Sequence, residues 1–94
     1  MRFEWDNEKA SYNALKHGID FKAAVFAFDD PCALIMADEK HSLAEVRQWL
    51  IGDSGTRVVV VVFTVRPPEE TIRIISARPA STKERKLYEQ KKRV

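Results

Sequence analysis

The sequence predicts an α+β domain with a mostly antiparallel sheet, because three patterns follow one another along its 94 residues. In the first third, apolar residues recur every three or four positions, as they do in amphipathic helices. The middle consists of short β-branched and aromatic runs separated by turn residues, which is typical of a strand meander. The last part is polar and basic and follows a helix-start signal. The length fits a single domain over residues 1–94.

Two helices are expected near the N-terminus, after a short strand over residues 2–5. Asp6 is a suitable N-cap for a helix over residues 7–17, and Gly18 suits the left-handed position that ends it. Asp20 is a suitable N-cap for the second helix. Inward-facing positions are expected at Ala10, Ala14 and Leu15 in the first helix and at Phe21, Ala24, Val25 and Phe28 in the second.

A four-strand meander plus this short N-terminal strand is expected to form the sheet, since short turns join the later strands. The valine-rich run 57–66 is expected to be central and covered on both faces. Pro79 is expected to end the last strand, and Ser81 or Thr82 to cap one C-terminal helix. Helices on one face complete the predicted fold. The strands are expected over residues 33–37, 43–51, 57–66 and 71–78, with a polar turn over residues 38–42.

Composition indicates a cytoplasmic protein. The single cysteine, Cys32, can form neither an internal disulfide nor a cysteine-rich zinc site. The charged N-terminus lacks the apolar segment of a signal peptide. The longest apolar run, residues 58–65, is too short to span a bilayer, so no membrane association is expected.

Basic residues are concentrated at the C-terminus. Residues 83–94 hold six basic and two acidic side chains in a chain of net charge +2, so the remainder is slightly negative. A basic end on a near-neutral body indicates contact with a polyanion, although a solvated terminal helix would have the same composition. The candidates for RNA contact are Lys83, Arg85, Lys91 and Lys92 there, with Lys16 and Arg47 elsewhere.

The final hairpin carries the strongest sign of chemistry. If its turn pairs Arg66 with Thr71, then Thr64 lies opposite Arg73, and these side chains share one face. Guanidinium groups that lie close together repel each other unless an anion sits between them, and they match phosphate oxygens well. The spacing therefore indicates a phosphate site.

Two points remain open for these arginines. Salt bridges to Glu45 or Glu70 would account for them without any ligand. Strict alternation places Arg78 on the opposite face from Arg73, unless a bulge or a bend before Pro79 changes its direction.

Histidine and acidic residues offer further candidates. His17 and His41 suit proton transfer near neutral pH, but a cation is favourable at a helix C-terminus and His41 lies in a polar turn. Asp29-Asp30 and Asp38-Glu39 would suit a metal-dependent nuclease only if they converged. Because both pairs have turn chemistry and match no ligand spacing, neither a metal nor another cofactor is expected.

The aromatic residues Trp5, Trp49 and Tyr88 could stack on bases. Trp5 alternates with charged residues and is expected in the core. Trp49 either packs under a helix or lies beside the polar site. Tyr88, on the basic helix, either contacts a nucleotide or anchors that helix to the sheet.

Residues along nearly the whole chain resemble the BrnT toxin family. The most specific part is the segment I-R-I-I-S-A-R at residues 72–78, followed by E-R-x-x-Y-E at residues 84–89. The other matching positions are Phe3-Glu4-Trp5-Asp6, Lys9-Ala10, Asn13, Lys16-His17-Gly18-Ile19, Phe21, Asp30-Pro31, Asp38, His41-Ser42, Glu45, Arg47, Ile51-Gly52, Ser54, Thr64, Arg66 and Ala80.

This resemblance implies a fold similar to RelE toxins and a ribonuclease toxin of a type II toxin–antitoxin system that blocks translation. It also implies a BrnA-type antitoxin as partner, with a ribbon-helix-helix DNA-binding part. The complex would be a heterotetramer that represses its own promoter and reaches DNA only through the antitoxin.

RNA supplies its own nucleophile, the 2′-hydroxyl, so its cleavage needs proton transfer and stabilised phosphorane charge but no metal ion. A noncatalytic binding module that acts as co-repressor with a DNA-binding partner is the alternative function. For cleavage, Arg66, Arg73 and Arg78 are the candidates that stabilise charge, and His17, His41, Glu84 and Tyr88 the candidates for acid and base.

Overall fold

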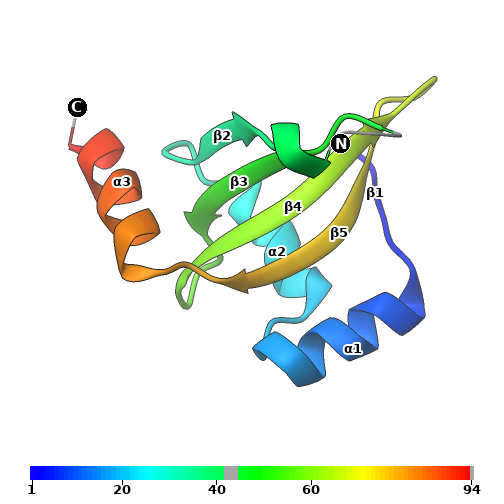
Figure 1. Ribbon diagram of the computed structural model, residues 1–94, viewed down its shortest axis with the longest axis horizontal. Helices are drawn as coiled ribbons and strands as arrows, with labels where there is room; N and C mark the ends of the chain where they lie inside the picture. The colour runs from blue at the N-terminus through cyan, green and yellow to red at the C-terminus, as the bar shows by residue number, and fades with distance from the viewer. Residues whose placement is uncertain (42–44, 94) are drawn as a thin grey trace.

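The structure, a computed structural model, describes residues 1–41 and 45–93, and its elements follow the predicted order (Figure 1). The side chain of His41 and the predicted strand residues Leu43 and Ala44 lie outside this description, as does Ser42. The elements are β1 (Phe3–Glu4), α1 (Asn7–His17), α2 (Phe21–Ala27), β2 (Leu34–Ala37), η1 (Glu39–His41), β3 (Gln48–Asp53), β4 (Val58–Arg66), β5 (Thr71–Pro79) and α3 (Thr82–Lys92).

The five strands form one sheet in the order β1-β5-β4-β3-β2. Strands β2 to β5 make the predicted antiparallel meander, and β1 joins its edge parallel to β5. The predicted register of the last hairpin is confirmed, since Arg66 pairs with Thr71 and Thr64 with Arg73. Pro79 pairs with Val59 and is the last residue of β5, so the strand includes this proline and ends at it.

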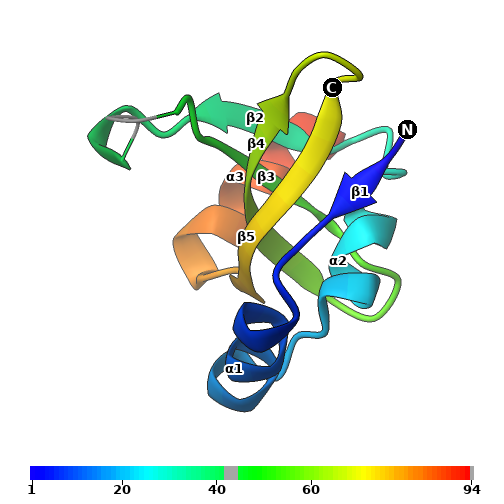
Figure 2. The ribbon, with the colours of Figure 1, turned by 90° about the vertical axis from the view of Figure 1, so that its right-hand side faces the viewer.

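The helices cover both faces of the sheet, whereas helices on one face were expected. Figure 2 shows the sheet between α2 and α3. Leu50 and Val59 belong to the larger core with α2, while Ile51 and Val60, their neighbours in sequence, pack with Tyr88 of α3. Alternation along a strand sends successive side chains to opposite faces. The central strand is therefore covered on both sides, as predicted, and the side that bears α3 is called the α3 face below.

Helix α1 uses a polar residue to meet the sheet, which differs from the prediction. Ala10 packs against the core, but Ala14 is exposed and the Leu15 side chain is 88% exposed. The buried residue is Asn13, whose side chain bonds both the N–H and the C=O of Ala77. An amide can both donate to and accept from the backbone groups at the edge of β5, which no apolar side chain can do.

The three helix starts are capped as the sequence predicts. The Asp6 carboxylate accepts from the N–H groups of Glu8 and Lys9, and Asp20 caps α2 in the same way. Ser81, rather than Thr82, caps α3 and forms a capping box with Glu84. Gly18 ends α1 at φ 70°, the left-handed position that favours glycine.

Strand β3 begins at Gln48, later than the predicted start at residue 43. The described residues before it bond outside the ladder of β3 and β4. The Thr64 hydroxyl donates to the C=O of Val46 at 2.6 Å, and the C=O of Arg47 accepts from Asp38 N–H. At Val46 a side-chain bond from Thr64 takes the place of a backbone bond between strands. Regular pairing of β3 with β4 therefore begins only at Gln48. In the part of the chain described, no helix is long and apolar enough to cross a membrane.

Candidate functional site

Two rows of side chains run across the α3 face and define the candidate site. Paired residues in antiparallel strands point to the same side, so each row follows the pairing of β2, β3, β4 and β5. Tyr88 packs on the first row, whereas the side chains of the second row stay partly exposed. The first row is Leu34, Ile51, Val60 and Arg78, and the second is Met36, Trp49, Val62 and Ser76.

A β-bulge in β5 decides where its arginines point. The pairing with β4 slips by one position at Ile75, which has no partner in the ladder. Without this slip, Arg73 and Arg78 would lie on opposite faces, as strict alternation predicts. With it, Arg73, Ser76 and Arg78 all lie on the α3 face, because their partners Thr64, Val62 and Val60 do.

Arg78 forms a two-pronged ion pair with Glu84 at the start of α3. Its Nη1 and Nη2 donate to the two carboxylate oxygens at 2.7 and 2.8 Å, and its guanidinium carbon lies 5.8 Å from the centre of the Trp49 ring. The hydrogen bonds from Arg78 lower the pKa of Glu84 to about 2, and those to Glu84 raise the pKa of Arg78. Glu84 therefore stays ionised at neutral pH and positions Arg78.

The three predicted arginines do not gather around one point. Arg73 donates to Glu4 at 3.1 Å, and Arg66 lies 3.6 Å from Glu45, the salt bridge considered as an alternative. Arg66 and the partner of Arg78 are six residues apart on β4, about 20 Å along the strand. A single phosphate cannot contact both ends of the hairpin, so the three arginines do not form one phosphate site.

A basic pocket lies between α1 and β5 and has a volume of about 360 Å³. It brings Arg47 together with Lys16 and His17, two neighbouring residues that lie far from it in the sequence. None of the described residues that line it is acidic. The lining residues are Lys9, Tyr12, Asn13, Lys16, His17, Arg47, Ile75 and Ser76.

Tyr88 anchors α3 to the sheet. Its side chain is 1% exposed, and its hydroxyl donates to the Asp30 carboxylate at 2.5 Å. Asp30 also accepts from the N–H groups of Cys32 and Asp53, so although burial raises its pKa, these bonds hold the pKa below the usual range. Burial and the bond to Asp30 raise the pKa of Tyr88. Of the two roles considered for Tyr88, the structure shows the anchor.

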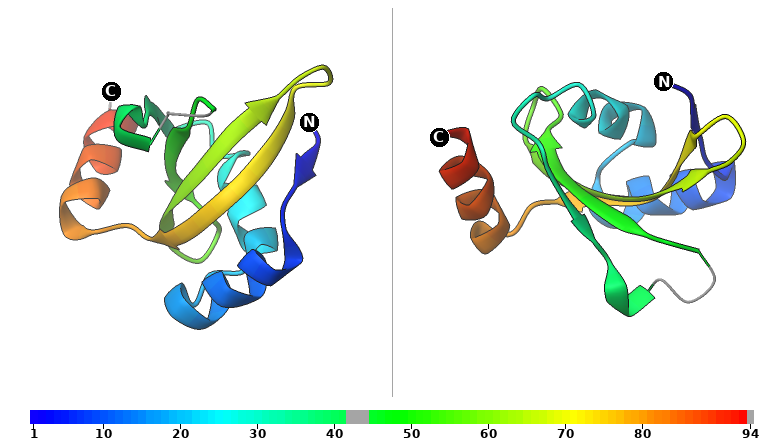
Figure 3. Two further views of the ribbon diagram at one scale, coloured as in Figure 1. Left: turned by 45° about the vertical axis from the view of Figure 1, so that its right-hand side comes forward. Right: turned by 90° about the horizontal axis from the view of Figure 1, so that it is seen from above.

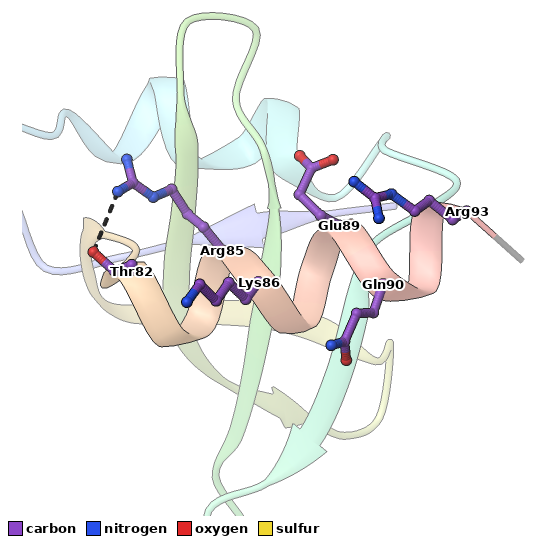
Figure 4. A pocket seen from close by; sticks show the side chains of 6 residues that line it. All are labelled: Thr82, Arg85, Lys86, Glu89, Gln90 and Arg93. Carbon is purple, nitrogen blue, oxygen red and sulfur yellow. Dashed lines mark hydrogen bonds between the residues drawn. The ribbon is translucent and has the colours of Figure 1, made fainter.

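The basic residues of α3 divide into two groups. Lys91 donates to the C=O of Ala33 at 2.6 Å, and the Lys92 amine lies 5.8 Å from the centre of the Tyr88 ring. Both lysines therefore contact other residues of the protein. Lys83 and Arg85 are exposed. Figure 4 shows an open depression on the outer side of α3, where Arg85 donates to Thr82. The residues lining it are Thr82, Arg85, Lys86, Glu89, Gln90 and Arg93.

Several residues of this region were missed by sequence reasoning. Lys9 and Tyr12 precede Lys16 by seven and four positions, a helical spacing that would have placed all three on one side of α1. The direction of the Ser76 side chain depends on the bulge at Ile75, which no sequence pattern indicates.

Trp5 packs edge-on against Phe21, as expected for a core residue. Among the described residues, no three histidine, cysteine or acidic side chains are placed to share a metal ion.

Comparisons with known proteins identify the family. The model of a family described as the ribonuclease toxin BrnT of type II toxin–antitoxin systems matches residues 5–84. The chain is also similar to the ribonuclease toxin BrnT of Brucella abortus, whose crystal structure was solved at 1.1 Å resolution. The two share 29% sequence identity with a TM-score of 0.65, over 87% of this chain and 99% of that chain. No curated protein sequence matches the chain.

The matched region spans most of the chain, including strands β2 to β5 and the bulge that turns Arg78 toward the α3 face. The solved toxin shares the arrangement of the sheet and helices over nearly its whole length. This chain therefore belongs to the BrnT family of ribonuclease toxins of type II toxin–antitoxin systems.

Proposed function

We propose that this toxin cleaves RNA without a metal ion, by attack of a 2′-hydroxyl on the neighbouring phosphate. The 2′-oxygen forms a bond to phosphorus, the bond to the 5′-oxygen breaks, and one proton moves from the former oxygen to the latter. The products are a 2′,3′-cyclic phosphate and a 5′-hydroxyl. Cleavage of messenger RNA by this route would inhibit translation.

The observation that carries the proposal is the bulge at Ile75. It puts Arg78 and Ser76 on one partly open sheet face, about 7 Å apart along β5. Ser76 also lines the pocket that contains His17, so cationic and proton-transferring groups border one surface. Such a surface supplies the charge stabilisation and the acid–base group that this reaction needs.

Arg78 is the residue that we place against the scissile phosphate. Its bonds to Glu84 and a longer one to Pro79 leave part of its fork of N–H donors free within the described residues. Glu84 orients the guanidinium, and His17 exchanges the proton. Arg73 and Arg47 add positive charge on either side, and Lys83 and Arg85 of α3 extend the surface for RNA.

The partner that we propose is a BrnA-type antitoxin with a ribbon-helix-helix DNA-binding part. Two toxins and two antitoxins would form a heterotetramer that binds DNA only through the antitoxin. Family membership supports an antitoxin partner in general. Co-expression with an antitoxin encoded beside the toxin, followed by measurement of the mass of the complex, tests this stoichiometry.

Induced expression in a sensitive host tests the nuclease, with growth and total RNA integrity followed together. We expect growth arrest with RNA loss for the wild type and recovery for Arg78→Ala. Arg57→Ala is the matched control, because Arg57 is an exposed arginine in the turn before β4. Normal growth with intact RNA at confirmed soluble expression would refute the proposal and favour a noncatalytic module.

Cleavage assays with the purified protein test whether the reaction needs a metal ion. RNA cleavage should continue in excess chelator and should leave a 2′,3′-cyclic phosphate on the upstream fragment. Loss of activity in chelator, restored by added Mg²⁺, would show instead that the reaction depends on a metal.

A further inference from the structure

We infer that the pocket beside α1 is a nucleotide subsite for single-stranded RNA. A backbone phosphate lies among Lys9, Lys16 and Arg47, and the adjoining base stacks on Tyr12. The inference rests on the proposed ribonuclease function and deepens it, because it names where the substrate is held outside the point of cleavage. Neither Lys9 nor Tyr12 is needed for the chemistry assigned to Arg78.

The charge of the pocket favours a phosphate. Lys9, Lys16 and Arg47 carry permanent positive charge, and all three line the pocket. The C-terminal end of α1 contributes only about half a negative charge, which the full positive charge of Lys16 outweighs. Like charges held together repel, so an anion between them is stabilised. The volume of about 360 Å³ lies in the range of small-ligand sites.

An exposed aromatic ring beside the pocket points to a nucleotide and not to a simple anion. The Tyr12 side chain is 65% exposed, and the Lys16 amine lies 5.8 Å from the centre of its ring. Proteins that bind single strands combine a basic groove with aromatic rings on which bases stack. Tyr12 and Lys16 are four residues apart on α1, which places ring and charge side by side.

The pocket is held rigidly, because Asn13 fixes α1 to the edge of β5. Its amide donates to the C=O of Ala77 at 2.8 Å and to that of Ile19 at 3.0 Å, and accepts from Ala77 N–H at 3.1 Å. Figure 1 shows α1 lying along the end of β5. Ser76, next to Ala77, belongs both to the pocket and to the candidate cleavage face. One RNA strand can therefore occupy both.

An acidic segment of the antitoxin is the competing occupant. Carboxylates would also be attracted by Lys9, Lys16 and Arg47. Base stacking, however, uses the face of Tyr12, which a carboxylate does not require. The tyrosine ring therefore distinguishes the two occupants experimentally.

The test measures binding of a short 2′-O-methyl oligouridylate, which lacks the nucleophile and cannot be cut. Tyr12→Ala is expected to weaken binding roughly tenfold, while Tyr12→Phe keeps the ring and binds as the wild type. Lys16→Ala should weaken binding and make the dependence on log salt concentration shallower by about 0.7. Lys22→Ala, an exposed lysine of α2, is the control and should change nothing.

Each outcome decides the matter. Unchanged RNA affinity in Tyr12→Ala and Lys16→Ala would overturn the inference. If RNA affinity were unchanged in those variants while the complex with the antitoxin became weaker, the pocket would be an antitoxin site. Because these side chains are exposed or line an open pocket, thermal unfolding should match the wild type. Weaker binding in the variants, together with a wild type that cuts no RNA, would support the subsite while refuting the proposed nuclease.

Discussion

Asn13 is the single residue on which the contact between α1 and the sheet depends most. It is buried and makes three hydrogen bonds to the backbone of Ile19 and Ala77. We expect Asn13→Ala to lower the free energy of unfolding by about 2–4 kcal/mol, because buried backbone groups lose their partners. Urea unfolding measures this, with Leu15→Ala as the control.

Leu15→Ala is a suitable control because Leu15 is exposed to solvent. Leu15 is a larger apolar residue two positions away, but most of its surface already contacts solvent. Its truncation should change stability by less than roughly 0.5 kcal/mol. Equal losses for the two variants would mean that α1 packs through its apolar residues and not through Asn13.

Glu84 links the stability of the protein to pH at acidic values. Its pKa falls from the ordinary 4.5 to about 2 in the folded chain, chiefly through the bonds from Arg78. A lowered pKa means stabilisation that is complete above about pH 4.5 and is lost as the pH falls toward 2. The size is at most roughly 3 kcal/mol, reduced by solvent screening at the partly exposed Arg78.

Glu84→Gln tests this linkage, because the amide still accepts from Ser81 N–H but carries no charge. Its unfolding free energy should be lower than that of the wild type at neutral pH, and the two should converge toward about pH 2. Parallel pH profiles would show that another group, such as Asp30, is responsible for the acid sensitivity.

At the scale of elements, α3 is attached to the sheet through few contacts. Figure 3 shows it standing at one end of the sheet, and its buried residue is Tyr88. Tyr88→Phe removes the hydroxyl bonded to Asp30, and we expect a loss of about 1–2 kcal/mol. Hydrogen exchange should speed up along α3 while the amides of β4 and β5 keep their protection.

Tyr88→Phe also separates anchoring from catalysis. Asp30 keeps its two backbone donors, so the carboxylate remains bonded in the variant. RNA cleavage by the folded variant should stay close to that of the wild type. A loss of cleavage much larger than the loss of stability would return Tyr88 to the candidates for acid or base.

At the scale of the whole molecule, the proposed function predicts that RNA binds to one side of the protein. The chain has a net charge of +2, yet the basic pocket and the exposed lysine and arginine of α3 flank the same sheet face. Binding to single-stranded RNA should weaken with salt. Removing Lys83 and Arg85 together should make that dependence shallower by about 0.7 for each side chain that contacts phosphate.

A salt titration of RNA binding by the double variant, beside Lys22→Ala, measures this. An unchanged slope would mean that α3 does not contact the RNA backbone. Its basic outer side would then be free for another partner, and the substrate would be held by the sheet face and the pocket alone.

Local patterns were enough to predict much of the fold. Helix caps at Asp6 and Asp20, the stripe of α2 and the register of the last hairpin follow from interactions between residues a few positions apart. The resemblance of residues 72–78 to the family indicated the function before any site was visible. Lys16, His17 and Arg47 were identified as candidates, but their common pocket was not.

Contacts between distant residues decided the rest. The face on which α3 packs depends on Tyr88 meeting Asp30, 58 positions away, and the place of α1 depends on Asn13 meeting Ala77, 64 positions away. The direction of Arg78 depends on a one-residue slip between paired strands. The sequence by itself thus determined which elements form and in what order, because those choices are local. Only the tertiary structure decided which side chains share a surface, because long-range packing selects the face and the register.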